Sequence, residues 1–135
     1  MEFASGAVGS ILTSFDIYGA KLPIIEIYGS KGTLRVPDPN CFGGPVVLHT
    51  PEGGDVEIPL AFDYPENSRA LGLAEMASAL EHGRAPRASW KQTLHVLEVL
   101  TGFERAVKQG GYLELETTYE REAPMADDQP HGVLD

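Results

Sequence analysis

Apolar and polar residues alternate along the first half of the chain, which is the pattern of a β-strand with one buried face. The alternation is clear between residues 7 and 17, and later short apolar runs are joined by turns that contain glycine. We expect two hairpins, one turned at residues 29–32 and one at residues 51–55, with a further strand before them and another after the helices. The six expected strands are residues 7–17, 24–28, 33–36, 46–50, 56–60 and 112–116.

In the second half the apolar residues recur at intervals of three and four, which is the period of a helix. The first helix is expected to end at Gly83 and to bury Leu73, Met76, Ala77 and Leu80. Ser89 and Gln92 have the spacing of a capping box, so a second helix is expected to begin at Trp90 and to end at Gly110. Its buried stripe is expected to consist of Val96, Val99, Leu100, Phe103 and Val107.

These elements predict an α+β fold: an antiparallel-rich mixed β-sheet of about six strands, two helices packed on one face, and the other face open for oligomerisation. Two helices cannot cover both faces, and the second face is expected to carry the apolar or small residues Leu12, Ser14, Tyr28 and Val47. Because large apolar patches are seldom left in water, we expect a homo-oligomer that associates through this sheet face. Residues 1–122 form the predicted domain, and the polar, acidic residues 123–135 are expected to form a flexible tail.

Length, net charge and cysteine content limit the kinds of partner and cellular setting that we expect for this chain. The chain of 135 residues is long enough for one domain with its own core. Its net charge of −10, with scattered arginines, argues against nucleic acid and against an anionic membrane as partners. The lone Cys41 cannot form a disulfide within the chain, which favours a reducing, cytoplasmic setting. No run approaches the roughly 20 apolar residues of a membrane span, and the first residues lack the pattern of a secretion signal.

Candidate chemistry is sparse. The chain contains neither a Gly-x-Gly-x-x-Gly motif nor a P-loop, and its four histidines are too far apart in sequence to predict a metal site. We therefore predict no catalytic, cofactor-binding or metal-binding residue. Arg69 lies in the first turn of the first helix, where an ion pair with Glu66 or Asp63 competes with a role toward a polar ligand or another domain. His95 flanks the apolar stripe of the second helix, where a hydrogen-bonded packing role competes with a role on the substrate side.

A set of short motifs, in a fixed order, resembles the carboxy-terminal domain of the Gfo/Idh/MocA family of NAD(P)-dependent oxidoreductases. The resemblance spans about residues 2–124 and is carried by IEIYG at 25–29, GTLRV at 32–36, PDPN at 37–40, FGGP at 42–45, NSRALGLAEM at 67–76 and LHVLE at 94–98. It implies an enzyme that moves a hydride between NAD or NADP and a sugar or polyol. The family's catalytic lysine lies in a Glu-Lys-Pro motif, which this chain lacks, and its Asp/His pair would fall before Met1. No catalytic or cofactor residue is therefore carried over.

Three hypotheses about function follow. The first is the substrate-side and oligomerisation domain of an NAD(P)-dependent sugar or polyol oxidoreductase, not catalytically competent alone, whose amino-terminal Rossmann domain is missing from this chain. The second is a stand-alone, non-catalytic binding or oligomerisation module. The third is an unrelated small acidic α+β enzyme, for which no constellation of residues argues. Under the first hypothesis, NAD or NADP belongs to the full-length parent, and Arg69 and His95 are the candidate substrate-side or interdomain residues.

Overall fold

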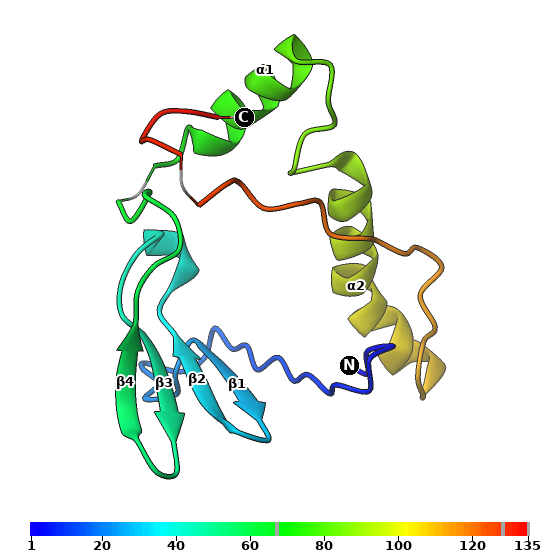
Figure 1. Ribbon diagram of the computed structural model, residues 1–135. Coiled ribbons are helices and arrows are strands. Elements are labelled where there is room, and N and C mark those ends of the chain that lie inside the picture. The colour runs from blue at the N-terminus through cyan, green and yellow to red at the C-terminus, as the bar shows by residue number, and fades with distance from the viewer. Residues whose placement is uncertain (67, 128, 135) are drawn as a thin grey trace.

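The computed structural model describes residues 1–66, 68–127 and 129–134. Within these residues the strands form one antiparallel sheet in the order β1-β2-β3-β4, followed along the chain by two helices (Figure 1). The elements are β1 (Ile25–Gly29), β2 (Gly32–Val36), the short 3-10 turn η1 (Pro39–Cys41), β3 (Val46–Thr50), β4 (Gly54–Ile58), α1 (Leu71–Glu81) and α2 (Trp90–Gln109).

Both predicted hairpins are confirmed, and glycine explains their tight geometry. Gly29 pairs with Gly32 at the end of the first hairpin. A Cβ on Gly32 would lie 2.4 Å from the carbonyl oxygen of His49 on β3, so a side chain there would push the two strands apart. In the second hairpin Gly54 adopts φ 63°, a conformation that glycine reaches without strain. The Gly53 N–H donates to Thr50 Oγ1 at 3.0 Å and closes the turn.

The sheet has one aliphatic face and one charged face, because side chains alternate along each strand and paired residues share a side. We call the first the aliphatic face; it consists of Ile25, Ile27, Leu34, Val36, Val46, Leu48, Val56 and Ile58. The opposite, charged face consists of Glu26, Tyr28, Thr33, Arg35, Val47, His49, Asp55 and Glu57. Tyr28 and Val47, predicted to lie on an apolar outer face, therefore lie among charged residues.

Helix α2 begins at Trp90 as predicted, and both helices end close to the predicted glycines. The prediction that Arg69 lies in the first turn of the first helix is wrong, because α1 begins at Leu71. Ser89 caps α2 by accepting from the Gln92 N–H at 3.3 Å, and Gly110 ends it with φ 75°. Gly83 follows α1 with φ 66°. The buried side of α1 differs from the prediction: Glu75 and Ala79 are buried, whereas Leu73, Met76 and Leu80 are exposed.

The prediction of about six strands is wrong. Residues 7–17 form no strand; Val8, within this segment, forms an isolated bridge with Glu2 outside the sheet. Residues 112–116 form no strand either, because the Glu116 N–H donates to the carboxylate of Glu98 on α2 at 2.8 Å instead of to a neighbouring strand. Alternation predicts which side chains share a face, but a strand also needs a backbone partner, and these two segments have none in the sheet.

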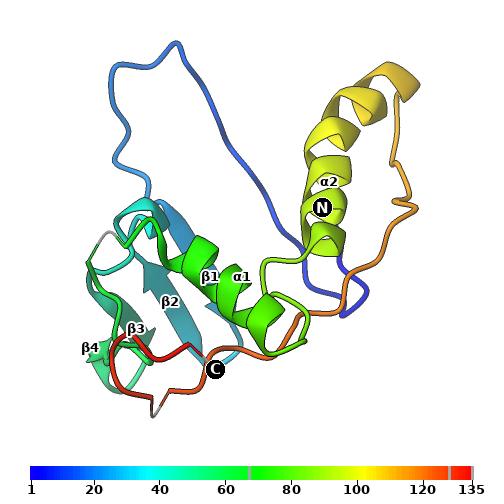
Figure 2. The ribbon, with the colours of Figure 1, turned by 90° about the horizontal axis from the view of Figure 1, so that it is seen from above.

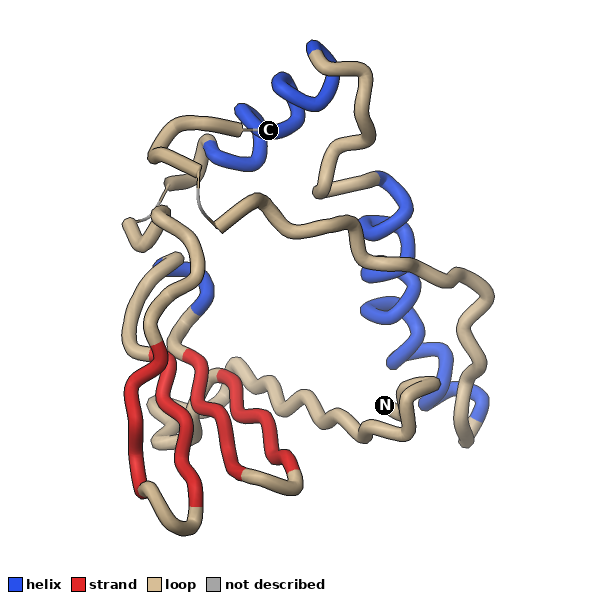
Figure 3. The backbone as a smooth tube through the Cα atoms, in the orientation of Figure 1, coloured by secondary structure: helices blue, strands red, loops and turns tan. Residues whose placement is uncertain are grey.

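The prediction that both helices pack on one sheet face is also wrong. Neither helix makes an extended contact with the sheet, and α2 stands apart from it in both views (Figures 1 and 2). Figure 3 shows the long connections between the sheet and the helices, with residues 10–24 crossing from the region of α2 to β1. Ala79 is the only buried hydrophobic residue in the described part of the chain, and Leu100, predicted to be buried, is exposed.

The accessible surface measures how open this arrangement is. The chain exposes 11,006 Å². A compact monomer of 14.6 kDa exposes about 6,900 Å² by the usual scaling of surface with mass. About 4,100 Å² is therefore exposed beyond what a chain of this size normally leaves in water. None of the helices described is long and apolar enough to cross a lipid bilayer.

Candidate functional site

A buried carboxylate fixes the corner between the two helices. Glu75, on the inner side of α1, is 4% exposed. It accepts from the guanidinium groups of Arg84 and Arg87, the latter at 3.0 Å, and from the Arg87 N–H at 3.2 Å. Burial raises the pKa of Glu75, but the hydrogen bonds from the two arginines outweigh it, so the pKa lies below its usual value. We call Glu75, Arg84 and Arg87 the elbow cluster.

The elbow cluster also reaches the carboxy-terminal segment. Arg87 Nε donates to the carbonyl oxygen of Ala123 at 3.0 Å, which ties that segment to the corner. Arg84 Nε and Nη2 are buried without a hydrogen-bond partner among the residues described. The patterns in the sequence did not predict this cluster. The signal was an acidic residue on one helix followed, within one loop, by two arginines, but the apolar spacing assigned Glu75 to the solvent side.

Arg69 connects two loops. Its Nη2 donates to the Asn40 carbonyl oxygen at 3.2 Å and to Asn40 Oδ1 at 2.6 Å, and its guanidinium lies 5.8 Å from the centre of the Phe42 ring. The described residues show no ion pair between Arg69 and either Glu66 or Asp63. The same two loops meet at Gly43, where a Cβ would lie 2.3 Å from the Pro65 carbonyl oxygen. Arg69 thus holds the connection between β4 and α1 against the η1 turn.

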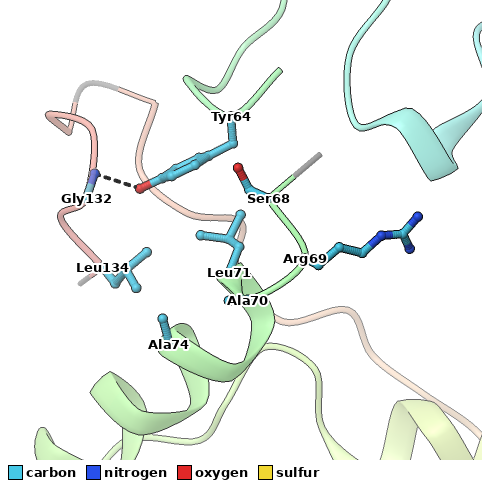
Figure 4. A pocket seen from close by; sticks show the side chains of 8 residues that line it. All are labelled: Tyr64, Ser68, Arg69, Ala70, Leu71, Ala74, Gly132 and Leu134. Carbon is cyan, nitrogen blue, oxygen red and sulfur yellow. Dashed lines mark hydrogen bonds between the residues drawn. The ribbon is translucent and has the colours of Figure 1, made fainter. Parts of the chain in front are cut away.

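A shallow hollow of about 450 Å³ lies beside Arg69, between the start of α1 and the carboxy-terminal segment (Figure 4). Its lining residues are Tyr64, Ser68, Arg69, Ala70, Leu71, Ala74, Gly132 and Leu134. The Gly132 N–H donates to the Tyr64 hydroxyl at 3.0 Å. Figure 4 shows the guanidinium of Arg69 pointing away from the space between Leu71 and Leu134. The guanidinium of Arg69 therefore lies outside that space.

The carboxy-terminal segment, predicted to be a flexible tail, makes specific contacts. Ser78 on α1 donates to the Leu134 carbonyl oxygen. The ring of His131 lies 4.8 Å from that of Tyr64, and His131 Nδ1 lies 2.9 Å from the Asp63 carbonyl oxygen. These contacts give the segment a defined place beside α1; its flexibility stays a prediction.

His95 belongs to a second network, on α2. Thr117 donates its hydroxyl hydrogen to Glu98, so the bond between His95 Nδ1 and Thr117 Oγ1, 2.9 Å long, is donated by the imidazole. Glu98 also accepts from the backbone N–H groups of Glu116 and Thr117. The Glu116 N–H, then the Thr117 hydroxyl and N–H, lower the pKa of Glu98 to about 2. His95 and Arg69 lie in separate networks, and the structure does not bring them together.

Charged side chains also interact across the sheet. Asp55 on β4 accepts from Arg35 and contacts His49 Nδ1 at 2.7 Å. The bonds from Arg35 and then from His49 lower the pKa of Asp55. Tyr28 donates to Glu26, which raises the pKa of the tyrosine. These side chains are hydrogen-bonded to one another on an exposed surface of the sheet.

The elbow cluster, Arg69 and His95 lie in separate hydrogen-bond networks. Among the described residues no group of three or more His, Cys, Asp or Glu side chains could hold a metal ion. Both helix starts also lack the glycine-rich turn that cradles a dinucleotide: α1 follows Ala70, and the start of α2 is capped by Ser89. No protein-family model, curated protein or solved structure matches the chain in the comparisons with known proteins.

Proposed function

We propose that this chain is a subunit-interface domain: the substrate-side and oligomerisation part of a cytoplasmic NAD(P)-dependent sugar or polyol oxidoreductase, not catalytically competent alone. One observation carries the interface role. The aliphatic face of the sheet and the apolar side of α2 are both open, and the chain exposes 11,006 Å² where a compact monomer exposes about 6,900 Å². A large exposed apolar surface of that kind is typical of a site where another protein surface binds.

The enzymatic part of the proposal is supported by the ordered motifs between residues 25 and 98. In such an enzyme the dinucleotide is held by an amino-terminal Rossmann domain, and the present chain supplies one wall of the substrate site. Arg69 and His95 are its candidate substrate-side or interdomain residues. Arg69 positions the loop around Asn40, and His95 positions residues 116–117 along α2 through Thr117. The cytoplasmic setting is supported by the lone, exposed Cys41.

Two measurements on the purified chain test the proposal together. Light scattering should give a mass above that of one chain, and a titration followed by NADH fluorescence should show no saturable binding at micromolar concentrations. A monomer with a native, cooperative unfolding transition would overturn the interface role. Micromolar, saturable NADH binding would overturn the assignment of the nucleotide to another domain.

The same open surface also favours a stand-alone oligomerisation module as a second candidate. The genomic DNA upstream of the Met1 codon separates the two functions. An in-frame Gly-x-Gly-x-x-Gly region within a strand-turn-helix pattern supports the oxidoreductase. An upstream stop codon without such a region supports the module.

A further inference from the structure

We propose that the aliphatic face of the sheet is covered by α2 of a second copy of this chain, and that the two copies exchange their helices reciprocally. The inference rests on the self-association proposed above and names the two surfaces that meet. The aliphatic face and α2 are both present in one chain, both open, and not in extended contact with each other.

The aliphatic face is the acceptor. Eight aliphatic side chains form it, and those toward its edges are half exposed: Ile27 is 56% exposed and Val56 is 50% exposed. A sheet with one such face is normally completed by a layer of helices. Strands of five residues span about 17 Å, whereas a helix of 20 residues is about 30 Å long. One α2 helix therefore crosses the whole face.

The open side of α2 is the donor. Val96, Leu100, Phe103 and Val107 recur at helical spacing and lie on one side of the helix. Leu100 is 59% exposed and Val107 is 81% exposed. Another side of α2 already has a partner, because residues 113–117 run along it: a Cβ on Gly102 would touch Leu113, and Glu98 accepts from Thr117. The apolar stripe is what remains for a second contact.

Two fixed connections hold α2 away from the sheet of its own chain. At the corner between α1 and α2, the elbow cluster joins Glu75 to Arg84 and Arg87. Between β4 and α1, Arg69 binds Asn40 and the loops meet closely at Gly43. With these connections in place α2 makes no extended contact with its own sheet, and folding it back would change the path of the chain between them. A second copy related by a two-fold axis can make the same helix-on-sheet contact without that change.

The area of the two surfaces suits such a dimer. Each chain exposes about 4,100 Å² more than a compact monomer of its mass. A standard interface buries only about 800 Å² per partner, and obligate homodimers bury more. In a reciprocal exchange each chain buries its aliphatic face and its α2 stripe, so two contacts per chain contribute to covering this excess.

Cross-linking between two different chains tests the exchange. In a Cys41→Ser background, Leu48→Cys places a thiol at the centre of the aliphatic face, and Leu100→Cys places one on the α2 stripe. The two single-cysteine chains are unfolded together, refolded as a mixture and treated with a short bis-maleimide. A covalent product of about twice 14.6 kDa is expected on a denaturing gel. Val47→Cys is the matched control, because Val47 precedes Leu48 and points to the charged face; paired with Leu100→Cys it should give no such product.

The other outcomes overturn the exchange in distinguishable ways. A doubly substituted chain, Leu48→Cys with Leu100→Cys, that cross-links only within itself would show that α2 covers its own sheet. A dimer in which Leu48→Cys cross-links to Leu48→Cys would show sheet-on-sheet packing, which refutes the exchange and leaves the interface role intact. A monomeric mass by light scattering would overturn the exchange and the interface role together, whereas NADH binding would overturn only the proposed division of labour with a nucleotide domain.

Discussion

Replacing Glu75 by Gln should destabilise the folded chain by about 2–4 kcal/mol. Glu75 is 4% exposed and accepts three hydrogen bonds, two of them from guanidinium groups. A hydrogen bond to a charged group contributes about 1.5–3 kcal/mol, and breaking a buried ion pair costs about 3–5 kcal/mol. The side chains of Arg84 and Arg87 are 27% and 22% exposed, so water compensates part of that loss and places the expected effect below the upper limit.

Glu81→Gln provides the control, because Glu81 is exposed near the end of the same helix and forms no ion pair among the described residues. Urea unfolding followed by far-ultraviolet circular dichroism, at one protein concentration for all variants, measures the difference. Glu81→Gln should shift the free energy of unfolding by less than about 0.5 kcal/mol. If Glu75→Gln costs no more than about 1 kcal/mol beyond this control, the elbow cluster does not hold the corner between the helices.

Three further predictions test other parts of the fold. Gly32→Ala should destabilise the sheet more than Gly29→Ala in urea unfolding. A Cβ at Gly32 would lie 2.4 Å from the His49 carbonyl oxygen, whereas a Cβ at Gly29 would lie 3.5 Å from the Gly32 carbonyl oxygen. Equal effects of the two substitutions would contradict the close approach of β2 and β3. The pKa of Glu98 is about 2 in the folded chain against an ordinary 4.5, so its network should hold residues 116–117 against α2 above about pH 4.5 and release them as the pH falls toward 2. The NMR chemical shifts of the Glu116 and Thr117 amides should change with pH along that titration, and this pH dependence should disappear in Glu98→Gln. Arg69→Lys should leave global stability within about 1 kcal/mol but speed amide hydrogen exchange around Asn40. A lysine lacks the planar guanidinium whose Nη2 donates to Asn40 while the group lies beside the Phe42 ring. Unchanged exchange would refute the tie between the two loops.

Local sequence signals predicted the elements that depend on local chemistry. The glycine-bounded turns predicted both hairpins, and the Ser89 cap and Gly110 predicted the two ends of α2. These signals work because a turn or a cap is formed by residues that are neighbours in the chain. The α+β class followed from the same elements.

Features that depend on distant partners were not predictable in this way. Residues 112–116 alternate like a strand, yet a carboxylate on α2 accepts the Glu116 N–H. The apolar residues of α1 were expected to be buried, but Glu75 faces inward because two arginines from the following loop neutralise it. The helices were expected to lie on the sheet because an aliphatic sheet face is normally covered by a layer of helices. The sequence pattern predicts such a layer but does not identify the helices that form it.

The mass of the purified chain in solution tests the central claim most directly. Light scattering at micromolar concentration should give about twice 14.6 kDa for the unaltered chain. Leu100→Asp, which places a charge on the apolar stripe of α2, should shift the mass toward that of one chain. Glu104→Asp, which keeps the charge of an exposed residue one turn away, should not. A cooperative, folded monomer of 14.6 kDa for the unaltered chain would contradict the claim that its open apolar surfaces form a subunit interface.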